Sequence, residues 1–323
     1  MSLPLAGMTI ALVVPKTYDY SIAISRELEN LGATVVRHEE WTEGVWLGIS
    51  ARAGLSSWFA RIRQARYLEK LGKLEVDCLL VIRGSTLPES FLLAFKLRFP
   101  NSKRIMYQWD SEQNNHYTHL IKHFDYCASF DLADCNRLDL NYLPLFFVRD
   151  LEQTPKRSAR YDLCLIGAYT ENRYRFYLKV KTLAEARGLT FKVFFFQPLA
   201  SKLKDILVGR KLTTSSTRLD RSEVYRLMGE SRCILDVHHS AQSGLTMRTI
   251  ETLAMGKKLI TTNAALKTEV FYNPESMKVV ELDDPELDPD WLAVTETKTN
   301  IDHLRLDRWL IDLLGQDSWA ASV

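Results

Sequence analysis

The sequence predicts an α/β protein with two domains, each built on an open parallel sheet. Short apolar runs alternate with segments of helical period along most of the chain. The alternation is interrupted once, by a polar stretch at 148–162, and the 323 residues suffice for two domains of ordinary size. Alternation at this pitch is typical of parallel strands joined by right-handed helical crossovers.

The first half opens with a strand pattern. The run MTIALVVP at 8–15 is continuously apolar, as expected for a parallel strand that is covered on both faces. A helix is predicted over 20–32, because its apolar positions have helical period and Gly32 can end it. Further strands are predicted at 33–41, 76–84 and 103–110, helices at 51–74 and 88–100, and strand-like composition at 124–131 and 141–147.

The alternation restarts after the polar stretch, which predicts two Rossmann-like domains facing a cleft. We expect an N-terminal domain over 1–150, a second domain over 158–300, and a C-terminal helix within 301–323 that crosses the junction. Ligands of such sheets bind beyond the carboxyl ends of the strands. In the second half, strands are predicted at 161–167, 189–196, 233–239 and 257–263, and helices at 171–188, 222–231, 246–256 and 302–315.

Composition narrows the class of protein. Lysine and arginine number 42 against 40 acidic residues, so a net charge of +2 argues against nucleic acid as a partner. Five dispersed cysteines without a CxxC pair suit reduced thiols in a cytoplasmic protein, and their spacing predicts no metal site. No apolar run has the length of about 18 residues that a spanning helix needs. We expect a cytoplasmic protein that is at most peripheral at the inner membrane face.

The segment at 233–263 contains the strongest chemical signal. A strand ends at His238 and His239, and a helix begins near Leu245, so backbone N–H groups would form an anion site there. Arg248, in the first turn, suits a phosphate, and Glu251 suits a ribose diol. Strand alternation would point one of the two histidines into the site. The alternative is a capped helix with Arg248 and Glu251 as a surface i,i+3 pair.

The stretch SGLTMRTIETLAMGKKLITTN resembles the donor-site motif of GT-B glycosyltransferases through Gly244, Leu245, Glu251, Ala254 and Gly256. It is similar above all to the spore-maturation and polysaccharide-biosynthesis subset of that group. DLCLIGAYTENRYRF at 162–176 resembles the opening of that subset's second domain, and FDLADCNRLDLNYLPLFF at 130–147 resembles the end of its first domain.

That resemblance implies a set of donor-binding residues. Ser243 stands where the retaining enzymes have a glutamate, so the stereochemistry of transfer stays open. Arg173 and Arg248 are the nearest substitutes for the basic pair of that group. The donor-binding candidates are Gly167, Arg173, Gln197, His238, Ser243, Gly244, Leu245, Thr246, Arg248 and Glu251, with Gln197 placed to contact the nucleotide base.

The implied activity is glycosyl transfer, in the hexosyltransferase class, from a nucleotide sugar to a surface polysaccharide or a lipid-linked glycan, as in lipopolysaccharide or capsule synthesis. Cations and N–H donors would stabilise the departing nucleotide phosphate, so neither metal nor cofactor is expected. Two alternatives stay open. One is a nucleotide-sugar 2-epimerase on the same fold, and the other is a non-catalytic nucleotide-sugar or glycan-binding partner of a synthase.

Two residues are candidates for catalysis. Asp110, in YQWDSEQNN at 107–115, follows a predicted strand of the first domain and could take the proton of an acceptor hydroxyl. It could equally cap a following helix or position the acceptor. His239, at the end of a second-domain strand, is the other candidate.

The segment 51–74 combines basic and aromatic residues. Six basic residues against Glu69 give 6 − 1 = +5, and Trp58 and Phe59 add apolar bulk. A helix of this kind can lie on an anionic membrane, where lipid-linked acceptors are found. The alternative is a helix that packs on its sheet with a solvated basic face. The basic residues are Arg52, Arg61, Arg63, Arg66, Lys70 and Lys73.

Overall fold

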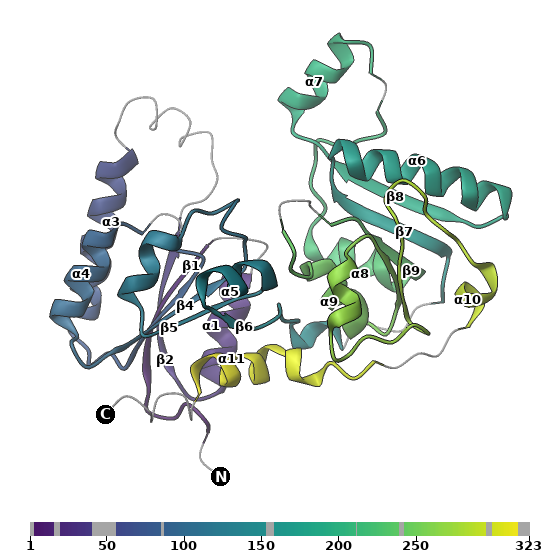
Figure 1. Ribbon diagram of the computed structural model, residues 1–323. Helices are drawn as coiled ribbons and strands as arrows, with labels where there is room; N and C mark the ends of the chain where they lie inside the picture. The colour runs from purple at the N-terminus through teal and green to yellow at the C-terminus, as the bar shows by residue number, and fades with distance from the viewer. Residues whose placement is uncertain are drawn as a thin grey trace. The chain divides into compact units, whose positions relative to one another are not determined.

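The computed structural model of this chain contains two compact units (Figure 1). Unit 1 comprises Met1–Pro144, Ala241–Gly244 and Leu306–Val323, and unit 2 comprises Leu145–Ser240 and Leu245–Arg305. Each unit contains its own parallel sheet, which confirms the predicted class of two α/β domains. The structure describes residues 3–15, 20–40, 56–84, 87–152, 158–210, 212–238, 242–294 and 299–315, with the side chains of 56–61 excepted.

Unit 1 is built on a six-stranded sheet with the order β2-β1-β3-β4-β5-β6. Every neighbouring pair is parallel. The strands are β1 (Thr9–Pro15), β2 (Thr34–Glu40), β3 (Cys78–Ile82), β4 (Lys103–Gln108), β5 (Tyr126–Ser129) and β6 (Asn141–Tyr142). The helices are α1 (Tyr20–Asn30), α3 (Ser56–Leu71), α4 (Glu89–Arg98), the 3₁₀ helix η1 (Thr118–His123), α5 (Leu132–Leu138) and α11 (Leu306–Leu314).

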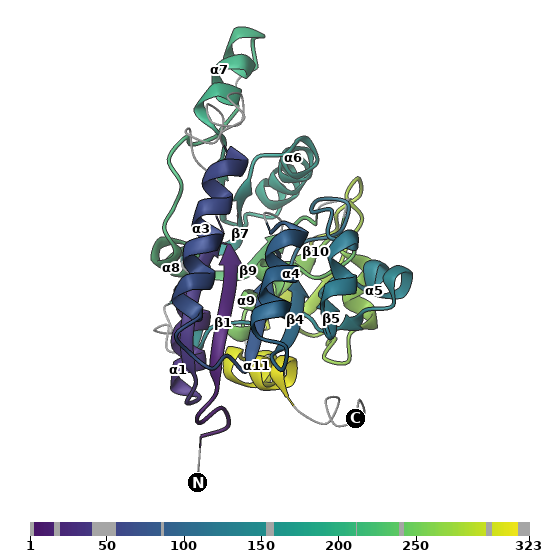
Figure 2. The same cartoon turned by 90° about the vertical axis from the view of Figure 1, so that its left-hand side faces the viewer.

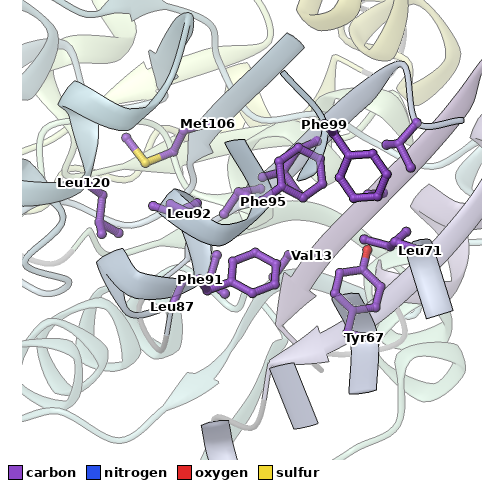
Figure 3. Packing of buried hydrophobic residues seen from close by; sticks show 14 of the residues in the cluster. Val13, Tyr67, Leu71, Leu87, Phe91, Leu92, Phe95, Phe99, Met106 and Leu120 are labelled. Carbon is purple, nitrogen blue, oxygen red and sulfur yellow. The ribbon is translucent and has the colours of Figure 1, made fainter. Parts of the chain in front are cut away.

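The helices α3 and α4 cover one face of this sheet (Figure 3). Tyr67 of α3 and Phe91 of α4 stack with ring centroids 6.2 Å apart above strand residues such as Val13. The Tyr67 hydroxyl donates to the carbonyl oxygen of Val36 at 2.7 Å, which satisfies its one buried polar group. Each large apolar side chain buried here contributes about 1.5–3 kcal/mol to folding. The side chains of α3 that the structure describes therefore have their apolar side in the core, in agreement with the packed-helix alternative for 51–74. Residues 51–55 and the side chains of 56–61, and with them Arg52, Trp58, Phe59 and Arg61, lie outside the described residues.

The C-terminal helix α11 belongs to unit 1 and contacts α1. Its Trp309 is fully buried and packs edge-on against Tyr107 with ring centroids 4.7 Å apart. The indole N–H of Trp309 donates to the carbonyl oxygen of Pro144 at 2.8 Å. The chain thus leaves unit 1 after Pro144, passes through it again at Ala241–Gly244, and returns to it a last time at Leu306.

Unit 2 has a five-stranded parallel sheet with the order β11-β10-β9-β7-β8. Phe176 and Val180 of α6 are buried in its core against strand residues such as Leu165. The strands are β7 (Tyr161–Ala168), β8 (Phe191–Phe196), β9 (Ser231–Asp236), β10 (Lys258–Thr261) and β11 (Met277–Val279). The helices are α6 (Glu171–Ala186), α7 (Leu199–Leu207), α8 (Arg221–Gly229), α9 (Met247–Ala254) and α10 (Pro289–Ala293).

Short 3₁₀ turns complete the two units: η2 (Arg149–Leu151), η3 (Ala264–Thr268) and η4 (Asp302–Leu304). Within the described residues, no helix combines the length and the apolar character that crossing a bilayer requires.

Candidate functional site

The candidate site lies at the carboxyl edge of the sheet in unit 2. The central strands β7 and β9 end at Ala168 and Asp236, and β10 ends beside them at Thr261. Because parallel strands end at the same edge, their following loops meet there. The helix α9 begins in this region, after its N-cap residue Thr246.

Hydroxyl groups fix the start of α9 to strand β9. Thr246 accepts a hydrogen bond from the backbone N–H of Thr249 at 3.2 Å, which satisfies one N–H group of the first turn. The hydroxyls of Thr246 and Thr249 both donate to Asp236 Oδ2, at 2.7 and 2.8 Å. The Asp236 carboxylate is buried at the positive end of the helix dipole, which stabilises its charge. The first N–H groups of α9, those of Met247 and Arg248, have no acceptor within the helix itself.

Arg173 crosses the ends of the two central strands. Thr170 caps α6 by accepting from the Arg173 backbone N–H at 3.2 Å, and this fixes the origin of the side chain. The guanidinium donates to the carbonyl oxygens of Ala168 at 2.5 Å and Val237 at 3.0 Å. Burial lowers the pKa of Arg173, the Asp236 charge opposes that shift, and the Arg248 charge adds to it. Arg173 and Arg248 are therefore close enough for their charges to interact.

Gly167 makes room for this guanidinium. A Cβ atom built at Gly167 would lie 3.1 Å from Arg173 Nη1, closer than carbon and nitrogen ordinarily approach. The two residues that the resemblance selected, Gly167 and Arg173, are thus in contact. A glycine is favoured at position 167 because a larger side chain would crowd the Arg173 guanidinium.

Arg248 and Glu251 form a pair inside unit 2. Arg248 Nη1 lies 3.0 Å from Glu251 Oε2, and the hydroxyl of Tyr225 donates to Oε1 of the same carboxylate at 3.0 Å. Nη1 also lies 2.7 Å from the sulfur of Met228. The spacing correctly predicted that the two residues meet, but Glu251 is buried and Arg248 is half-buried where the surface alternative expected an exposed pair. Arg248 Nε is buried and donates to none of the described residues, so one donor is available.

Two other donor-site candidates organise their own loops. His238 contacts Thr262 Oγ1 through both its backbone N–H and its ring Nδ1, each at 3.1 Å. Gln197 is buried, and its amide oxygen accepts from the Thr214 hydroxyl at 2.8 Å while its amide nitrogen donates to Asp205. The amide of Gln197 thus fixes the loop after β8. His239, predicted as catalytic, lies outside the described residues.

The residues just before α9 belong to unit 1. The backbone N–H of Ser243 donates to Asp131 Oδ2 at 2.7 Å, and its hydroxyl accepts from the backbone N–H of Ala133 at 3.0 Å. A Cβ atom at Gly244 would overlap Phe130, so this glycine is required by packing. Leu245 begins the return to unit 2, and its side chain is buried.

Asp110 follows β4 at the carboxyl edge of the sheet in unit 1. Its Oδ1 accepts from the Gln242 amide at 2.8 Å, and its Oδ2 lies 3.6 Å from Arg83 Nε. The residues after Asp110 form a turn, so the carboxylate caps no helix there. Asp110 and Arg83 therefore form a partly buried ion pair at this edge.

Arg83 was not selected from the sequence. Its backbone has φ +73°, a left-handed conformation that costs a residue with a side chain about 1–2 kcal/mol. The amides of Gln108 and Asn115 donate to the Arg83 carbonyl oxygen at 2.8 and 3.4 Å, and they hold it in this conformation. Strain maintained by dedicated contacts is typical of functional sites. The available sequence signal was a charged residue directly after a buried strand.

No protein-family model and no curated protein sequence matches this chain. Solved structures are similar to it over most of their length. The UDP-GlcNAc 2-epimerase from Neisseria meningitidis bound to UDP-GlcNAc is 14% identical, with 88% of this chain and 89% of the epimerase covered and a TM-score of 0.48.

Two glycosyltransferase structures are similar to a comparable degree. The lipopolysaccharide outer core galactosyltransferase WaaB is 11% identical, with 97% of both chains covered and a TM-score of 0.47. MurG from Acinetobacter baumannii is 10% identical, with 88% of both chains covered and a TM-score of 0.46.

Proposed function

We propose that this protein is a glycosyltransferase that uses a nucleotide-sugar donor held at the carboxyl edge of the sheet in unit 2. The observation that carries the proposal is the placement of Arg173 and Arg248 around the start of α9. Their charges interact, and Arg248 has one buried N–H group without an acceptor among the described residues. A diphosphate would bridge two such cations and accept from the first N–H groups of α9.

The same groups would assist the departure of the nucleotide. Negative charge builds up on the phosphate as the bond to the sugar breaks, so donors already fixed in place interact more strongly in the transition state. Arg173 is fixed by the carbonyl oxygens of Ala168 and Val237, and Arg248 by Glu251. Little reorganisation is therefore needed when the charge develops.

For the acceptor, we propose that Asp110 of unit 1 takes the proton of the attacking hydroxyl. Arg83 would position the Asp110 carboxylate through their 3.6 Å ion pair, and a base must be held within hydrogen-bond reach of the proton that it takes. The resemblance of 162–176 to the spore-maturation and polysaccharide-biosynthesis subset supports a surface polysaccharide or a lipid-linked glycan as the acceptor.

The test begins with donor binding. A thermal-stability screen against uridine, adenosine and thymidine diphosphates and their sugars should find a ligand that raises the melting temperature. Calorimetry should then show that Arg173→Ala and Arg248→Ala each raise Kd about tenfold or more, which is about 1.4 kcal/mol. Arg187→Ala is the control, because Arg187 is an exposed residue at the far end of α6.

Product analysis separates the proposal from its alternatives. Release of free nucleotide with a glycosylated acceptor supports transfer, and Asp110→Asn should abolish it while donor binding persists. Conversion of the donor sugar to its 2-epimer would instead identify an epimerase. Binding without turnover in any acceptor mixture would identify a non-catalytic partner, and unchanged affinity in both arginine variants would contradict the donor site.

A further inference from the structure

The helix α7 presents an apolar face that none of the described residues of unit 2 covers. Its apolar residues recur at positions i, i+4, i+7 and i+8, the spacing of one helical face. None of the nine residues of α7 is buried. The exposed fractions are 61% for Leu199, 50% for Leu203, 57% for Ile206, 85% for Leu207 and 71% for the adjoining Val208. A surface helix of a globular protein ordinarily buries this stripe.

The polar face of α7 is the one that contacts unit 2. Lys202 Nζ donates to the carbonyl oxygen of Thr214 at 2.6 Å, and Asp205 accepts from the amide of the buried Gln197. These contacts orient the helix with its apolar face outward. Figures 1 and 2 both show α7 standing clear of α6 and of the sheet in unit 2.

Basic residues flank the apolar face. On a helix of 3.6 residues per turn, Lys202 and Lys204 lie on opposite sides of the Leu203 stripe, and Asp205 lies behind it. Residues 199–211 contain four basic residues and one acidic residue, so their net charge is 4 − 1 = +3. An apolar stripe between lysines is the pattern of helices that lie in the interface of an anionic bilayer, where lysine stems extend towards the headgroups.

We propose that α7 binds the surface of an anionic phospholipid membrane, with Leu203, Ile206 and Leu207 among the acyl chains and the exposed Lys204 at the headgroups. A second copy of the chain fits the face less well. Nine residues of helix are only about 13 Å long. Two such faces would bury far less than the roughly 1,200 Å² of a stable interface. The proposal is independent of nucleotide binding and of the segment 51–74.

Vesicle flotation tests the proposal on the full chain without nucleotide. The wild type should float with vesicles of phosphatidylglycerol and phosphatidylcholine, and less with pure phosphatidylcholine. The double variant Leu203→Ser/Leu207→Ser should bind the anionic vesicles with an affinity lower by about tenfold or more. The matched control is Leu97→Ser/Val270→Ser, which removes apolar side chains that are 84% and 94% exposed elsewhere. The control should bind like the wild type.

A spectroscopic readout locates the contact. The five natural cysteines are buried, so a polarity-sensitive dye attached to Leu207→Cys reports this position. Its emission should shift to the blue with anionic vesicles, and the same dye on Leu97→Cys should not shift. Equal flotation of the serine double variant and the wild type would overturn the proposal. A concentration-dependent dimer in light scattering that the double variant abolishes would overturn it too, because the face would then join copies of the chain.

Discussion

Arg248 donates to the carboxylate of Glu251 across 3.0 Å, one turn into α9, and the carboxylate is buried. The pair therefore has two roles, one in the stability of unit 2 and one in the proposed donor site. It stabilises unit 2, because each charge compensates the other in a region of low polarity. It also fixes a guanidinium beside Arg173, where we propose that the donor diphosphate binds.

The structural role predicts a large effect of Glu251→Leu on stability. We expect the free energy of unfolding to fall by about 2–4 kcal/mol, because Arg248 and the Tyr225 hydroxyl lose their buried acceptor. Urea denaturation measures the change. Glu185→Leu is the control, since its carboxylate is 66% exposed in an i,i+4 pair with Lys181 and should contribute no more than about 0.5 kcal/mol.

Gly167→Ala should impair the donor site more than the fold. The added methyl group would displace the Arg173 guanidinium from the strand ends, so we expect nucleotide affinity to fall about tenfold. Calorimetry gives the affinity and thermal unfolding the stability. Gly72→Ala, where the new methyl makes only ordinary contacts, should change neither. Wild-type affinity in Gly167→Ala would show that the position of Arg173 does not matter for binding.

Thr246→Ala should loosen the start of α9. The variant loses the cap on the Thr249 N–H and a hydrogen bond to Asp236, and we expect a loss of about 1–2 kcal/mol of unfolding free energy. Thr246→Ser keeps both hydrogen bonds and should restore most of the stability. Equal stability of the alanine and serine variants would contradict this account of the cap.

We expect the free energy of unfolding to decrease as the pH is lowered, because His38 is partly buried in the folded chain. Burial, with a smaller contribution from Arg63, lowers the pKa of His38 from 6.5 to about 4. Between these values the unfolded chain takes up a proton that the folded chain does not, so stability is fully present above pH 6.5 and lost as the pH falls toward 4. Because the ring is partly solvated, we expect a loss of about 1–2 kcal/mol.

The His38 contribution can be isolated with a variant. His38→Phe retains a ring to stack on Tyr67 and should show a flatter dependence of unfolding free energy on pH in urea titrations. An unchanged slope between pH 6.5 and 4 would assign the acid sensitivity to other groups.

Arg83→Gly should separate stability from activity. Glycine adopts the φ of +73° without strain, so the variant should gain up to about 1 kcal/mol in stability, while the proposed acceptor side loses its cation and turnover falls. Asp139→Gly, at φ +55° in the C-cap of α5, is the matched control and should leave turnover unchanged. Wild-type turnover in Arg83→Gly would remove Arg83 from the proposed acceptor side.

The sequence by itself determined the two α/β units. Buried parallel strands such as β1 and β3 have continuous apolar runs, and helices such as α6 have caps and helical period, so local pattern identifies both. It also determined that Arg248 and Glu251 meet, because residues three apart share a helical face. The short elements α5, α7 and β11 were not predicted, since so few residues give a weak period.

Only the tertiary structure decided what the polar residues contact. Side chains from different elements meet at the strand ends. There the Asp236 carboxylate accepts from the Thr246 hydroxyl, and the Arg173 guanidinium donates to the Val237 carbonyl oxygen. The direction of the apolar face of α7 also depended on contacts from Gln197 and Thr214 that no local period encodes. The position of a residue in the sequence determines which face of its own helix or strand it occupies. The packing of helices and strands against one another determines which residues that face contacts.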